Sequence, residues 1–468
     1  MKVEQIYTGC LAQGAYYIES RGEVAIIDPL RETLPYLRKA EKNDARIKYI
    51  FETHFHADFV SGHVDLANST GAEIVYGPGA KTEYDIHEAL DGEEFRLGEV
   101  KIKVLHTPGH TPESSTFLLF DEAGKEYAIF SGDTLFIGDV GRPDLAVKSD
   151  LTQKDLAGML YDSLRNKIMP LPDDIIVYPA HGAGSACGKN MSKDTFDSLG
   201  NQKKTNYALR ADMTKQEFIT EVTTGILPPP QYFAKNAMLN KTGAHDFDKV
   251  LRKGSIALEV ETFEAMANHE GALVLDTRSP IEFSEGHIPN SIFIGIDGSF
   301  APWVGALIND LKQPIIYIVK EGREEEVVTR LSRVGYDNTL GYLKGGIEAW
   351  KIAGKELATI TSISAYQFQQ DLEENSLNVL DVRKPTEYDA EHVAGASNSP
   401  LDFINDHMDE LIHDKKYYIH CLGGYRSMIY ASILKSRGFH NLVDVAGGFK
   451  AITETSIPRT NFVCENAK

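Results

Sequence analysis

The stretch THFHADFVSGH, residues 53–63, carries the clearest chemical signal in the chain. Its alternate residues His54, His56 and Asp58 have side chains that bind metal ions, and the next residue is Phe59, whose ring cannot. Histidines two apart on a loop can turn both imidazoles toward one ion, while a nearby carboxylate binds a second ion or holds a ligand. The stretch predicts a metal site beside an apolar group, and the plainer alternative is a set of polar residues that satisfy a turn.

Runs of strand-forming residues, separated by turn residues, predict a β-rich first half. They cover residues 15–20, 23–29, 47–54, 72–79, 100–109, 115–121, 127–134 and 174–182. Four residues of metal-binding types stand at the ends of such runs: His54, His110, Asp133 and His181. Loops at strand ends converge in layered α/β folds, so we expect these four side chains to meet in one cleft.

Length and composition limit the possible classes. A chain of 468 residues predicts about three domains. The net charge of −20 argues against a nucleic-acid partner, which is held by clustered Lys and Arg. No apolar run reaches the roughly 20 residues that cross a membrane, and no basic-then-apolar leader opens the sequence. We therefore expect a cytoplasmic protein with no membrane partner.

The four cysteines, Cys10, Cys187, Cys421 and Cys464, are scattered along the chain. So few in such a length make a poor disulfide framework and fit a reducing compartment. Any that matter are expected to act as thiols, and Cys464 is expected to be incidental.

The second half of the chain repeats itself. ALVLDTRSPIEFSEGHIPNSIFI, from Ala272, is echoed by LNVLDVRKPTEYDAEHVAGASNSP, from Leu377. We interpret these as two copies of one α/β module, each roughly a hundred residues long. Prolines and polar residues in LPPPQYFAKNAMLNKTG, residues 227–243, predict a linker near residue 245. The expected domains are residues 1–245, 246–357 and 358–468.

The two copies differ where chemistry is expected. In the second copy, Cys421 follows a strand and begins CLGGYRS, which opens a helix. Backbone N–H groups and the helix N-terminus would lower the pKa of this thiol, and Arg426 adds a positive charge at the rim. The alternative is a cysteine that merely packs at a strand end.

The first copy places Val319 or a neighbour where the second has its cysteine, and its loop is rich in glutamate. These glutamates are Glu321, Glu324, Glu325 and Glu326. They would repel an anionic substrate, so this copy is expected to be an inactive spacer or docking module.

The ordered set THFHADFVSGH, TPGHT, SGDTLF and YPAHG resembles the metallo-β-lactamase superfamily across about the first 245 residues. The resemblance implies an αββα sandwich. In the binuclear hydrolases of that superfamily a histidine follows the aspartate of the first motif and helps to bind a second metal. Phe59 stands at that position here, which argues against a complete second site and a metal-bridged hydroxide.

The remaining set, His54, His110 and Asp133, is the two-histidine, one-carboxylate triad associated with mononuclear non-haem Fe(II) and O2 chemistry. The pattern resembles the persulfide dioxygenase branch, which oxidises the terminal sulfur of a thiol persulfide to sulfite. The resemblance implies one Fe(2+) per chain. It also implies outer-shell or substrate-side roles for the remaining polar residues near the motifs: His56, Asp58, His181, Arg142 and Cys187. For Arg142 the alternative is a surface arginine in a turn, and for Cys187 a small buried structural thiol.

The segment CLGGYRS, with LDVRKPTEYDAEHVAGA before it, resembles a rhodanese sulfurtransferase domain over roughly residues 360–465. The resemblance makes Cys421 the nucleophile that carries a sulfane sulfur. It makes the following loop its persulfide cradle: Leu422, Gly423, Gly424 and Tyr425, with Arg426 completing the catalytic set.

The whole chain resembles multidomain persulfide dioxygenase-sulfurtransferases of bacterial sulfide detoxification. The expected fold class is α/β, a metallo-β-lactamase sandwich followed by two rhodanese-like domains. The expected partners are a low-molecular-weight thiol persulfide, O2, sulfite and thiosulfate, with sulfur passing at Cys421 in either direction. The sequence leaves open self-association into a homo-oligomer. Two alternatives remain: a glyoxalase II-type thioester hydrolase with two metals, and a sulfur-trafficking protein whose first domain only binds.

Overall fold

The computed structural model describes residues 1–147 and 151–461. Two compact units are present, residues 1–249 with 329–336, and residues 250–328 with 337–468. Cys464 lies outside the described residues. The other three cysteines, Cys10, Cys187 and Cys421, are free thiols, as expected. Within the described ranges no helix has the length and apolar character needed to cross a membrane.

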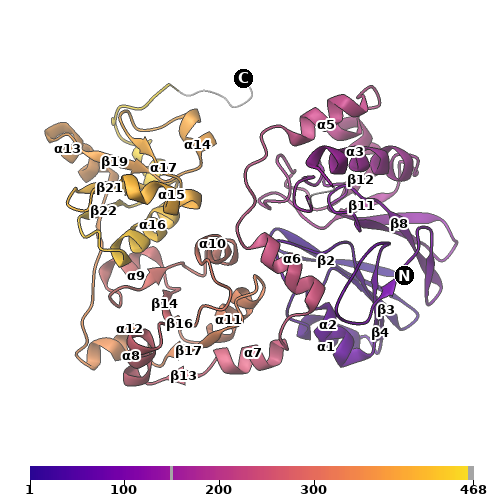
Figure 1. Cartoon of the computed structure of the whole chain (residues 1–468), viewed down its shortest axis with the longest axis horizontal. Helices are drawn as coiled ribbons and strands as arrows, with labels where there is room; N and C mark the ends of the chain where they lie inside the picture. The colour runs from indigo at the N-terminus through magenta and orange to yellow at the C-terminus, as the bar shows by residue number, and fades with distance from the viewer. Residues whose placement is uncertain (148–150, 462–468) are drawn as a thin grey trace. The chain divides into compact units, whose positions relative to one another are not determined.

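Two six-stranded sheets form the centre of the first unit (Figure 1). The first sheet consists of β1 (Lys2–Thr8), β2 (Gln13–Ser20), β3 (Glu23–Ile27), β4 (Arg46–Glu52), β5 (Glu73–Tyr76) and β6 (His87–Glu88). The second consists of β7 (Glu94–Leu97), β8 (Val100–His106), β9 (Ser115–Phe120), β10 (Glu126–Gly132), β11 (Ile176–Pro179) and β12 (Asp197–Ser198). Strands β3 to β6 run parallel, as do β10 and β11, and the other neighbours are antiparallel.

Each sheet buries one face against the other sheet and the opposite face under helices. Tyr16 and Ile18 of β2 share one core with Phe117 of β9 and Phe130 of β10, which places that core between the sheets. A second core joins the first sheet to α1 (Leu34–Lys42) and α2 (His63–Thr70). A third joins the second sheet to α3 (Gln153–Ser163), α4 (Leu199–Thr205) and α5 (Lys215–Thr223). This layering confirms the αββα sandwich.

The predicted strand runs are all found, as β2 to β5 and β8 to β11. The proline-rich stretch 227–243, which in the sequence indicated the end of the first domain, contains helix α6 (Phe233–Thr242). Two of its polar residues, Asn236 and Asn240, are buried in the structure. Helix α7 (Phe247–Gly254) follows.

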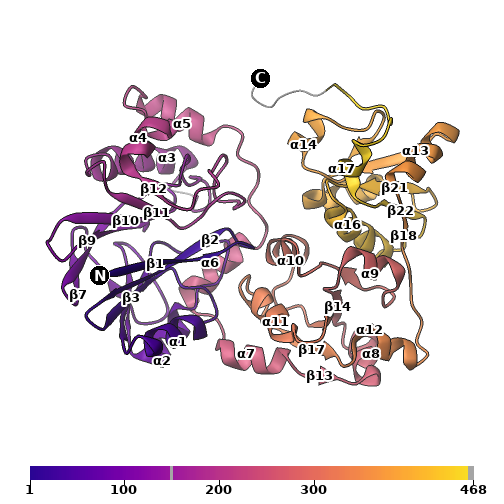
Figure 2. The same cartoon turned by 180° about the vertical axis from the view of Figure 1, so that it is seen from behind.

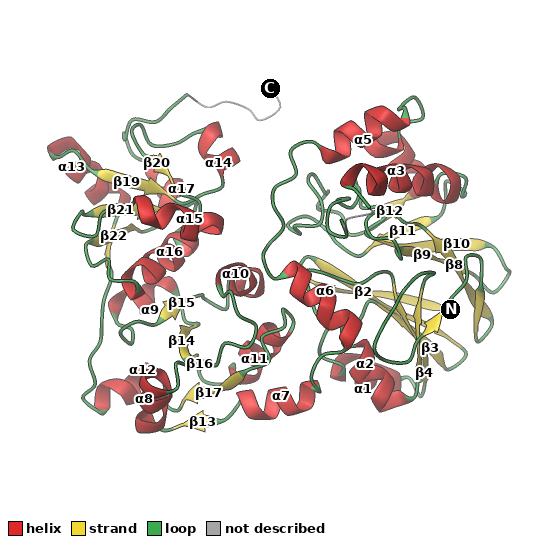
Figure 3. Ribbon diagram, in the orientation of Figure 1, coloured by secondary structure: helices red, strands yellow, loops and turns green. Residues whose placement is uncertain are grey.

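The two repeats have parallel five-stranded sheets with the same strand order (Figures 2 and 3). In the first repeat the order is β13 (Ala257–Leu258), β17 (Thr339–Leu343), β16 (Ile315–Ile318), β14 (Leu273–Asp276) and β15 (Ile292–Phe293). In the second it is β18 (Thr361–Ile363), β22 (Leu442–Val445), β21 (Tyr417–His420), β19 (Asn378–Asp381) and β20 (Ser397–Asn398). The internal repeat in the sequence therefore corresponds to a repeat in structure.

Helices cover both sheets of the repeats. The first repeat has α8 (Val260–His269), α9 (Pro280–Glu285), α10 (Phe300–Leu307), α11 (Glu324–Ser332) and α12 (Gly346–Ile352). The second has α13 (Ala365–Glu374), α14 (Pro385–Ala390), α15 (Ile404–His407), α16 (Tyr425–Ser436) and α17 (Gly448–Ile452). The fold is thus mixed α/β throughout.

A buried arginine-aspartate pair recurs at the same place in each repeat. Arg278 contacts Asp276 at 2.6 Å, and Arg383 contacts Asp381 at 2.6 Å. Each guanidinium also donates to a backbone carbonyl eight residues on, that of Gly286 or Glu391. Because both charges in each pair are buried, removal of one would leave the other uncompensated. Both pairs therefore support the fold of their repeat.

Candidate functional site

Two histidines and an aspartate meet at the ends of three strands of the sandwich. His54 follows β4, His110 lies between β8 and β9, and Asp133 follows β10. Their ligand atoms all lie within 4.8 Å of one another, and all three side chains are buried. The Nε2 atoms of His110 and His54 lie 3.4 Å and 3.9 Å from Asp133 Oδ2. The convergence predicted from the strand ends is therefore present.

Hydrogen bonds on the far side of each imidazole fix which nitrogen faces the group. The Thr53 hydroxyl donates to Asp28 Oδ2 at 2.9 Å, so it can only accept from His54 Nδ1, 3.0 Å away. His110 Nδ1 lies 2.9 Å from the carbonyl oxygen of Arg142, so it must carry a hydrogen. Both Nε2 atoms are then left as lone-pair donors, the arrangement that orients histidine for a metal ion.

The donor set fits a divalent metal ion. Both carboxylate oxygens of Asp133 are buried and have no hydrogen-bond partner. An unpaired buried carboxylate is costly, and a cation at this point would compensate it. Burial, reinforced by the neighbouring His56, His110 and His181, holds the pKa of His54 well below its ordinary value. Neutral imidazole is the form that binds metals.

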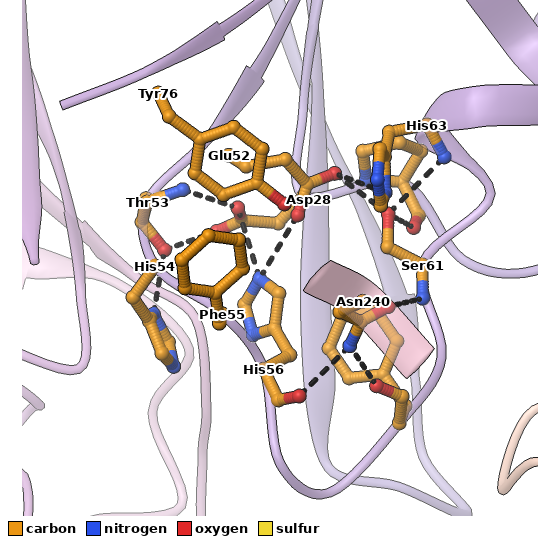
Figure 4. A network of polar contacts seen from close by, with 12 residues as sticks. Asp28, Glu52, Thr53, His54, Phe55, His56, Ser61, His63, Tyr76 and Asn240 are labelled. Atoms are coloured by element: carbon orange, nitrogen blue, oxygen red, sulfur yellow. Dashed lines mark hydrogen bonds and ion pairs between the residues drawn. The ribbon is translucent and has the colours of Figure 1, made fainter. Parts of the chain in front are cut away.

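His56 directs its Nε2 atom toward a polar network that contains Asp28 and Glu52 (Figure 4). Its Nε2 atom lies 3.0 Å from Asp28 Oδ1 and 3.5 Å from Glu52 Oε2. Burial opposes a charge on His56, but Asp28 and Glu52 raise its pKa to about 9. Asp28 also accepts from the Thr53 amide at 2.8 Å, so the same carboxylate supports the residue that orients His54.

Phe59 is fully buried beside His56. Its ring centroid lies 4.4 Å from that of His56. The carbonyl groups of His56 and Phe59 both accept from Asn240 Nδ2, each at 2.8 Å. Figure 4 shows Asn240 beside His56. Asn240 Oδ1 in turn accepts from the Ser61 amide. Helix α6 thus holds the loop that carries the first motif.

A second group of ligand-type atoms adjoins the first. His181 Nε2 lies 3.4 Å from Asp58 Oδ2 and 3.6 Å from Asp133 Oδ1. His181 belongs to two sets of residues whose ligand atoms lie within 4.8 Å of one another. One set is completed by His56 and Asp58, and the other by Asp133 and Cys187. Burial opposes a charge on His181, but Asp58 and Asp133 hold its pKa well above the ordinary value. By distance alone, these residues could hold a second ion.

Cys187 is buried against this second group. Burial, with the nearby charges of Asp58 and Asp133, raises the pKa of its thiol to about 12. Without a cation beside it, the sulfur is therefore protonated at neutral pH and is a poor nucleophile. Its substrate role stays a prediction.

Arg142 is buried and its guanidinium already has partners. It forms four hydrogen bonds, two to the Asp144 carboxylate and one each to the carbonyls of Ala186 and Leu227. Its own carbonyl accepts from His110, and its amide donates to the Cys187 carbonyl. The arginine thus orients His110 through its backbone. Contact with an anionic substrate stays a prediction, and it would require the Asp144 pair to open.

The second repeat carries a different kind of site at the end of β21. Cys421 is buried there, and the Gly424 amide donates to its Sγ at 3.1 Å. Gly424 adopts φ +97°, which glycine tolerates, and α16 begins at the next residue. Arg426 makes a two-pronged contact with Glu387, at 2.6 Å and 2.8 Å. The arginine is therefore fixed, and part of its charge is neutralised.

Strand register identifies the position in the first repeat that corresponds to Cys421. Ile318 pairs with Asp276 as His420 pairs with Asp381. The next residues, Val319 and Cys421, therefore occupy equivalent positions. Four and five residues further on, Arg323 and Glu324 stand where the second repeat has Tyr425 and Arg426.

Several residues of these sites were not found from the sequence. Asp28 follows a strand run as the metal-group residues do, so its position was a usable signal. Asn240 gave no such signal, because its contacts lie far away in sequence. Gly141 and Gly448 were also missed: a Cβ on Gly141 would lie 2.0 Å from the Asp133 carbonyl, and one on Gly448 would lie 2.4 Å from the Cys421 carbonyl.

Comparison with known proteins identifies the parts of the chain. The Metallo-beta-lactamase superfamily matches residues 8–181, and the Rhodanese-like domain matches residues 259–353 and 364–455. Persulfide dioxygenase ETHE1, mitochondrial, of Homo sapiens is 36% identical over 215 residues, covering 46% of this chain and 76% of the relative. Hydroxyacylglutathione hydrolase GloC of Haemophilus influenzae is 30% identical over 220 residues, covering 42% of this chain and 98% of the relative.

A solved structure extends the similarity into the repeats. The crystal structure of a metallo-beta-lactamase from Staphylococcus aureus subsp. aureus COL matches with TM-score 0.66 and 32% identity. The match covers 73% of this chain and 99% of the Staphylococcus aureus chain. The chain therefore belongs to the metallo-β-lactamase superfamily, with ETHE1 persulfide dioxygenases among its homologues, and joins that domain to two rhodanese-like domains.

Proposed function

We propose that the protein oxidises a thiol persulfide with O2 at one iron ion and transfers sulfane sulfur through Cys421. The observation that carries the first half is the buried triad of His54, His110 and Asp133, with both Asp133 oxygens unpaired. Similarity to persulfide dioxygenases supports it. The proposed domains are residues 1–245 for oxidation, 246–357 for the inactive repeat and 358–468 for sulfur transfer.

The triad would hold Fe(2+), which when bound supplies the binding and activation of O2. His54 and His110 would be held in orientation by Thr53 and by the Arg142 carbonyl. Phe59 occupies the position of a metal-binding histidine in the binuclear relatives, which favours a single ion.

The proposed oxidation balances as R–S–SH plus O2 and H2O giving R–SH and H2SO3. The S–S bond breaks, the terminal sulfur is oxidised, and O2 is reduced. Asp58 and His181, which lie beside the triad, would accept and donate protons or hold the substrate. The sulfur attached to R leaves as the thiol R–SH, and the terminal sulfur leaves as sulfite.

Cys421 would serve the second half. Its thiolate attacks the terminal sulfur of a second persulfide, which gives Cys421–S–S⁻ and releases R–SH. Sulfite then attacks that outer sulfur, which gives thiosulfate and returns the Cys421 thiolate. The Gly424 amide on Sγ and the fixed Arg426 would stabilise the anionic sulfur in both steps. Run in reverse, the site would take sulfur from thiosulfate.

A glyoxalase II-type thioester hydrolase is the second candidate. It is favoured by the cluster of His56, Asp58 and His181, which could hold a second ion, and by similarity to hydroxyacylglutathione hydrolases. A two-metal hydrolase would use a bridging hydroxide and consume no oxygen. The orientation of His56 toward Asp28, with Phe59 beside it, argues for the single-ion alternative.

Metal analysis combined with oxygen-uptake measurements distinguishes the dioxygenase from the thioester hydrolase. The protein, purified anaerobically, is assayed for bound metal and for O2 consumption with glutathione, coenzyme A and bacillithiol persulfides, and with S-lactoylglutathione. The proposal predicts one iron per chain, oxygen uptake with at least one persulfide and no thioester cleavage. Two tightly bound zinc ions with thioester hydrolysis would replace it by the hydrolase.

A further inference from the structure

Helix α16, which follows the Cys421 loop, is buried on every side. Eight consecutive residues from Ser427 to Leu434 are buried. A helix at the surface of a domain exposes one face, so a second element must cover the outer face of this one. The Ser432 hydroxyl accepts from the Phe293 amide at 3.0 Å, and Phe293 belongs to β15 of the first repeat. The first repeat therefore supplies part of that cover.

A close contact between the repeats lies at Tyr425, the first residue of α16. Its hydroxyl donates to the Gly295 carbonyl at 2.7 Å. A Cβ on Gly298 would lie 2.3 Å from Cζ of the Tyr425 ring, closer than real Cβ atoms come. Phe293 meets the same ring edge-on, with centroids 6.0 Å apart. We call residues 295–298 the glycine turn; it receives the Tyr425 ring because Gly298 has no side chain.

Tyr425 directly follows the residue that contacts the sulfur. The Gly424 amide donates to Cys421 Sγ at 3.1 Å, and Gly424 holds a left-handed φ of +97°. A displacement of Tyr425 would rotate the Gly424 peptide and move its N–H group off the sulfur. The way the Tyr425 ring packs against the first repeat therefore affects the geometry at the Cys421 thiol.

The degenerate loop of the first repeat also contacts the glycine turn. Arg323, equivalent to Tyr425, contacts Asp297 of that turn at 2.7 Å. Asp297 is largely exposed, so this ion pair contributes little. The steric fit at Gly298 and the Tyr425 hydrogen bond are the stronger links.

We propose that the inactive repeat is a positioning scaffold: its glycine turn holds Tyr425 and so keeps the Gly424 amide on the Cys421 sulfur. Tyr425 is then a positioning residue. This inference rests on the proposed sulfur transfer at Cys421, and it gives the first repeat a role without any chemistry of its own.

The test uses the full-length protein with Gly298→Ala and Tyr425→Phe. Gly286→Ala is the matched control, because its Cβ would meet only Leu357 Cδ1, at an ordinary 3.5 Å. Two quantities are measured: kcat and KM for sulfur transfer from thiosulfate to cyanide, and the alkylation rate of Cys421 by iodoacetamide, followed by mass spectrometry of its peptide. Thermal unfolding is recorded for every variant.

We expect Gly298→Ala to lower kcat about 10- to 100-fold, because catalytic geometry is sensitive to displacements near 1 Å. Tyr425→Phe, which loses only the hydrogen bond, should lower kcat about 3- to 10-fold. Both should change KM little and alter the alkylation rate of Cys421, while Gly286→Ala matches the parent. In a Tyr425→Ala background, adding Gly298→Ala should change kcat by less than about twofold, because the ring it would displace is gone.

Parental kcat and alkylation rates in folded Gly298→Ala and Tyr425→Phe proteins would overturn the inference. If Gly298→Ala does not fold, the inference is tested by Tyr425→Phe and by Tyr425→Ala with and without Gly298→Ala. Failure of the parent itself to transfer sulfur would instead refute the proposed function, since the alkylation rates still report whether the scaffold acts on Cys421.

Discussion

The metal group is assembled from side chains that several loops deliver, whereas the thiol at Cys421 is surrounded by the backbone of its own loop. At the first, His54, His110 and Asp133 come from the ends of three strands. At the second, the contact on the sulfur is the Gly424 amide. The difference teaches what each site depends on: the metal group requires three side chains from separate strands, whereas the geometry around the Cys421 sulfur also depends on the backbone of one loop, which an added Cβ would displace.

The largest effect is expected at the side-chain site. Asp133→Ala removes one of three ligands and leaves two imidazoles, too few for firm chelation. We expect loss of bound iron after dialysis and a fall in persulfide-dependent oxygen uptake of at least about a thousandfold, as for loss of an essential catalytic group. Metal analysis and an oxygen electrode measure both, with sulfur transfer by Cys421 as the internal control. Retained iron and oxygen uptake would remove Asp133 from the ligand set.

At the Cys421 site, one added methyl group on the backbone should be enough to lower sulfur transfer. Gly448 has φ +56°, and a Cβ there would lie 2.4 Å from the Cys421 carbonyl and 2.9 Å from the Gly423 nitrogen. We expect Gly448→Ala to lower sulfur-transfer kcat by about a hundredfold, through displacement of the loop, with oxygen uptake unchanged.

Gly395→Ala is the control for backbone strain alone. Gly395 has φ +83° in the same repeat, with nothing within 4 Å of its Cβ position. Its replacement should cost about 1–2 kcal/mol of stability from the left-handed conformation, with kcat retained. Equal losses of activity in both variants would show that strain, not crowding at Cys421, is responsible.

A smaller effect, on the free energy of unfolding, is expected at Asp444 of β22. Asp444 accepts hydrogen bonds from Ser427 and Ser362, yet burial raises its pKa to about 6. Because the folded pKa lies above the unfolded one, the protonated carboxyl stabilises the fold below about pH 4, and that contribution is lost as pH rises to about 6. Above that, the buried charge is a penalty.

Asp444→Asn should therefore raise the free energy of unfolding by about 1–2 kcal/mol at pH 7, with the gain shrinking toward pH 5. Urea unfolding at both pH values measures it. A gain that does not depend on pH would assign the effect to packing and not to the charge.

The smallest expected effect concerns the missing nucleophile of the first repeat. Val319 is equivalent to Cys421 by strand register, but Glu324 replaces Arg426 there. In a Cys421→Ser background we expect Val319→Cys to give no measurable thiosulfate turnover, because the acidic loop disfavours both a thiolate and an anionic substrate. Robust turnover would show that the loop can serve as a sulfur site.

The sequence predicted the side-chain site better than its surroundings. His54, His110, Asp133 and His181 each follow a strand run, and the structure brings them together. The direction of His56 toward Asp28 was not predictable, because it depends on a network closed by residues from other segments.

Backbone contacts were the hardest to predict. A glycine gives no sign of which atom lies where its side chain would be, so neither Gly448 nor Gly298 was identified. The CLGGYRS motif predicted the loop around Cys421, but the partner of Tyr425 lies 130 residues away. The role of α6 was not predictable for a similar reason, since Asn240 is buried against carbonyl groups that are distant in sequence.

The coupling of the two sites is the central claim, and product analysis of Cys421→Ser tests it most directly. The parent, Cys421→Ser and His54→Ala are incubated with persulfide under limited oxygen, with controls for the direct reaction of sulfite with persulfide. A hydroxyl is far less acidic than a thiol and cannot carry the sulfane sulfur, so Cys421→Ser should keep its oxygen uptake and accumulate sulfite where the parent forms thiosulfate. His54→Ala should lose oxygen uptake and keep sulfur transfer from thiosulfate. Thiosulfate formation by Cys421→Ser at the parental rate would contradict the account.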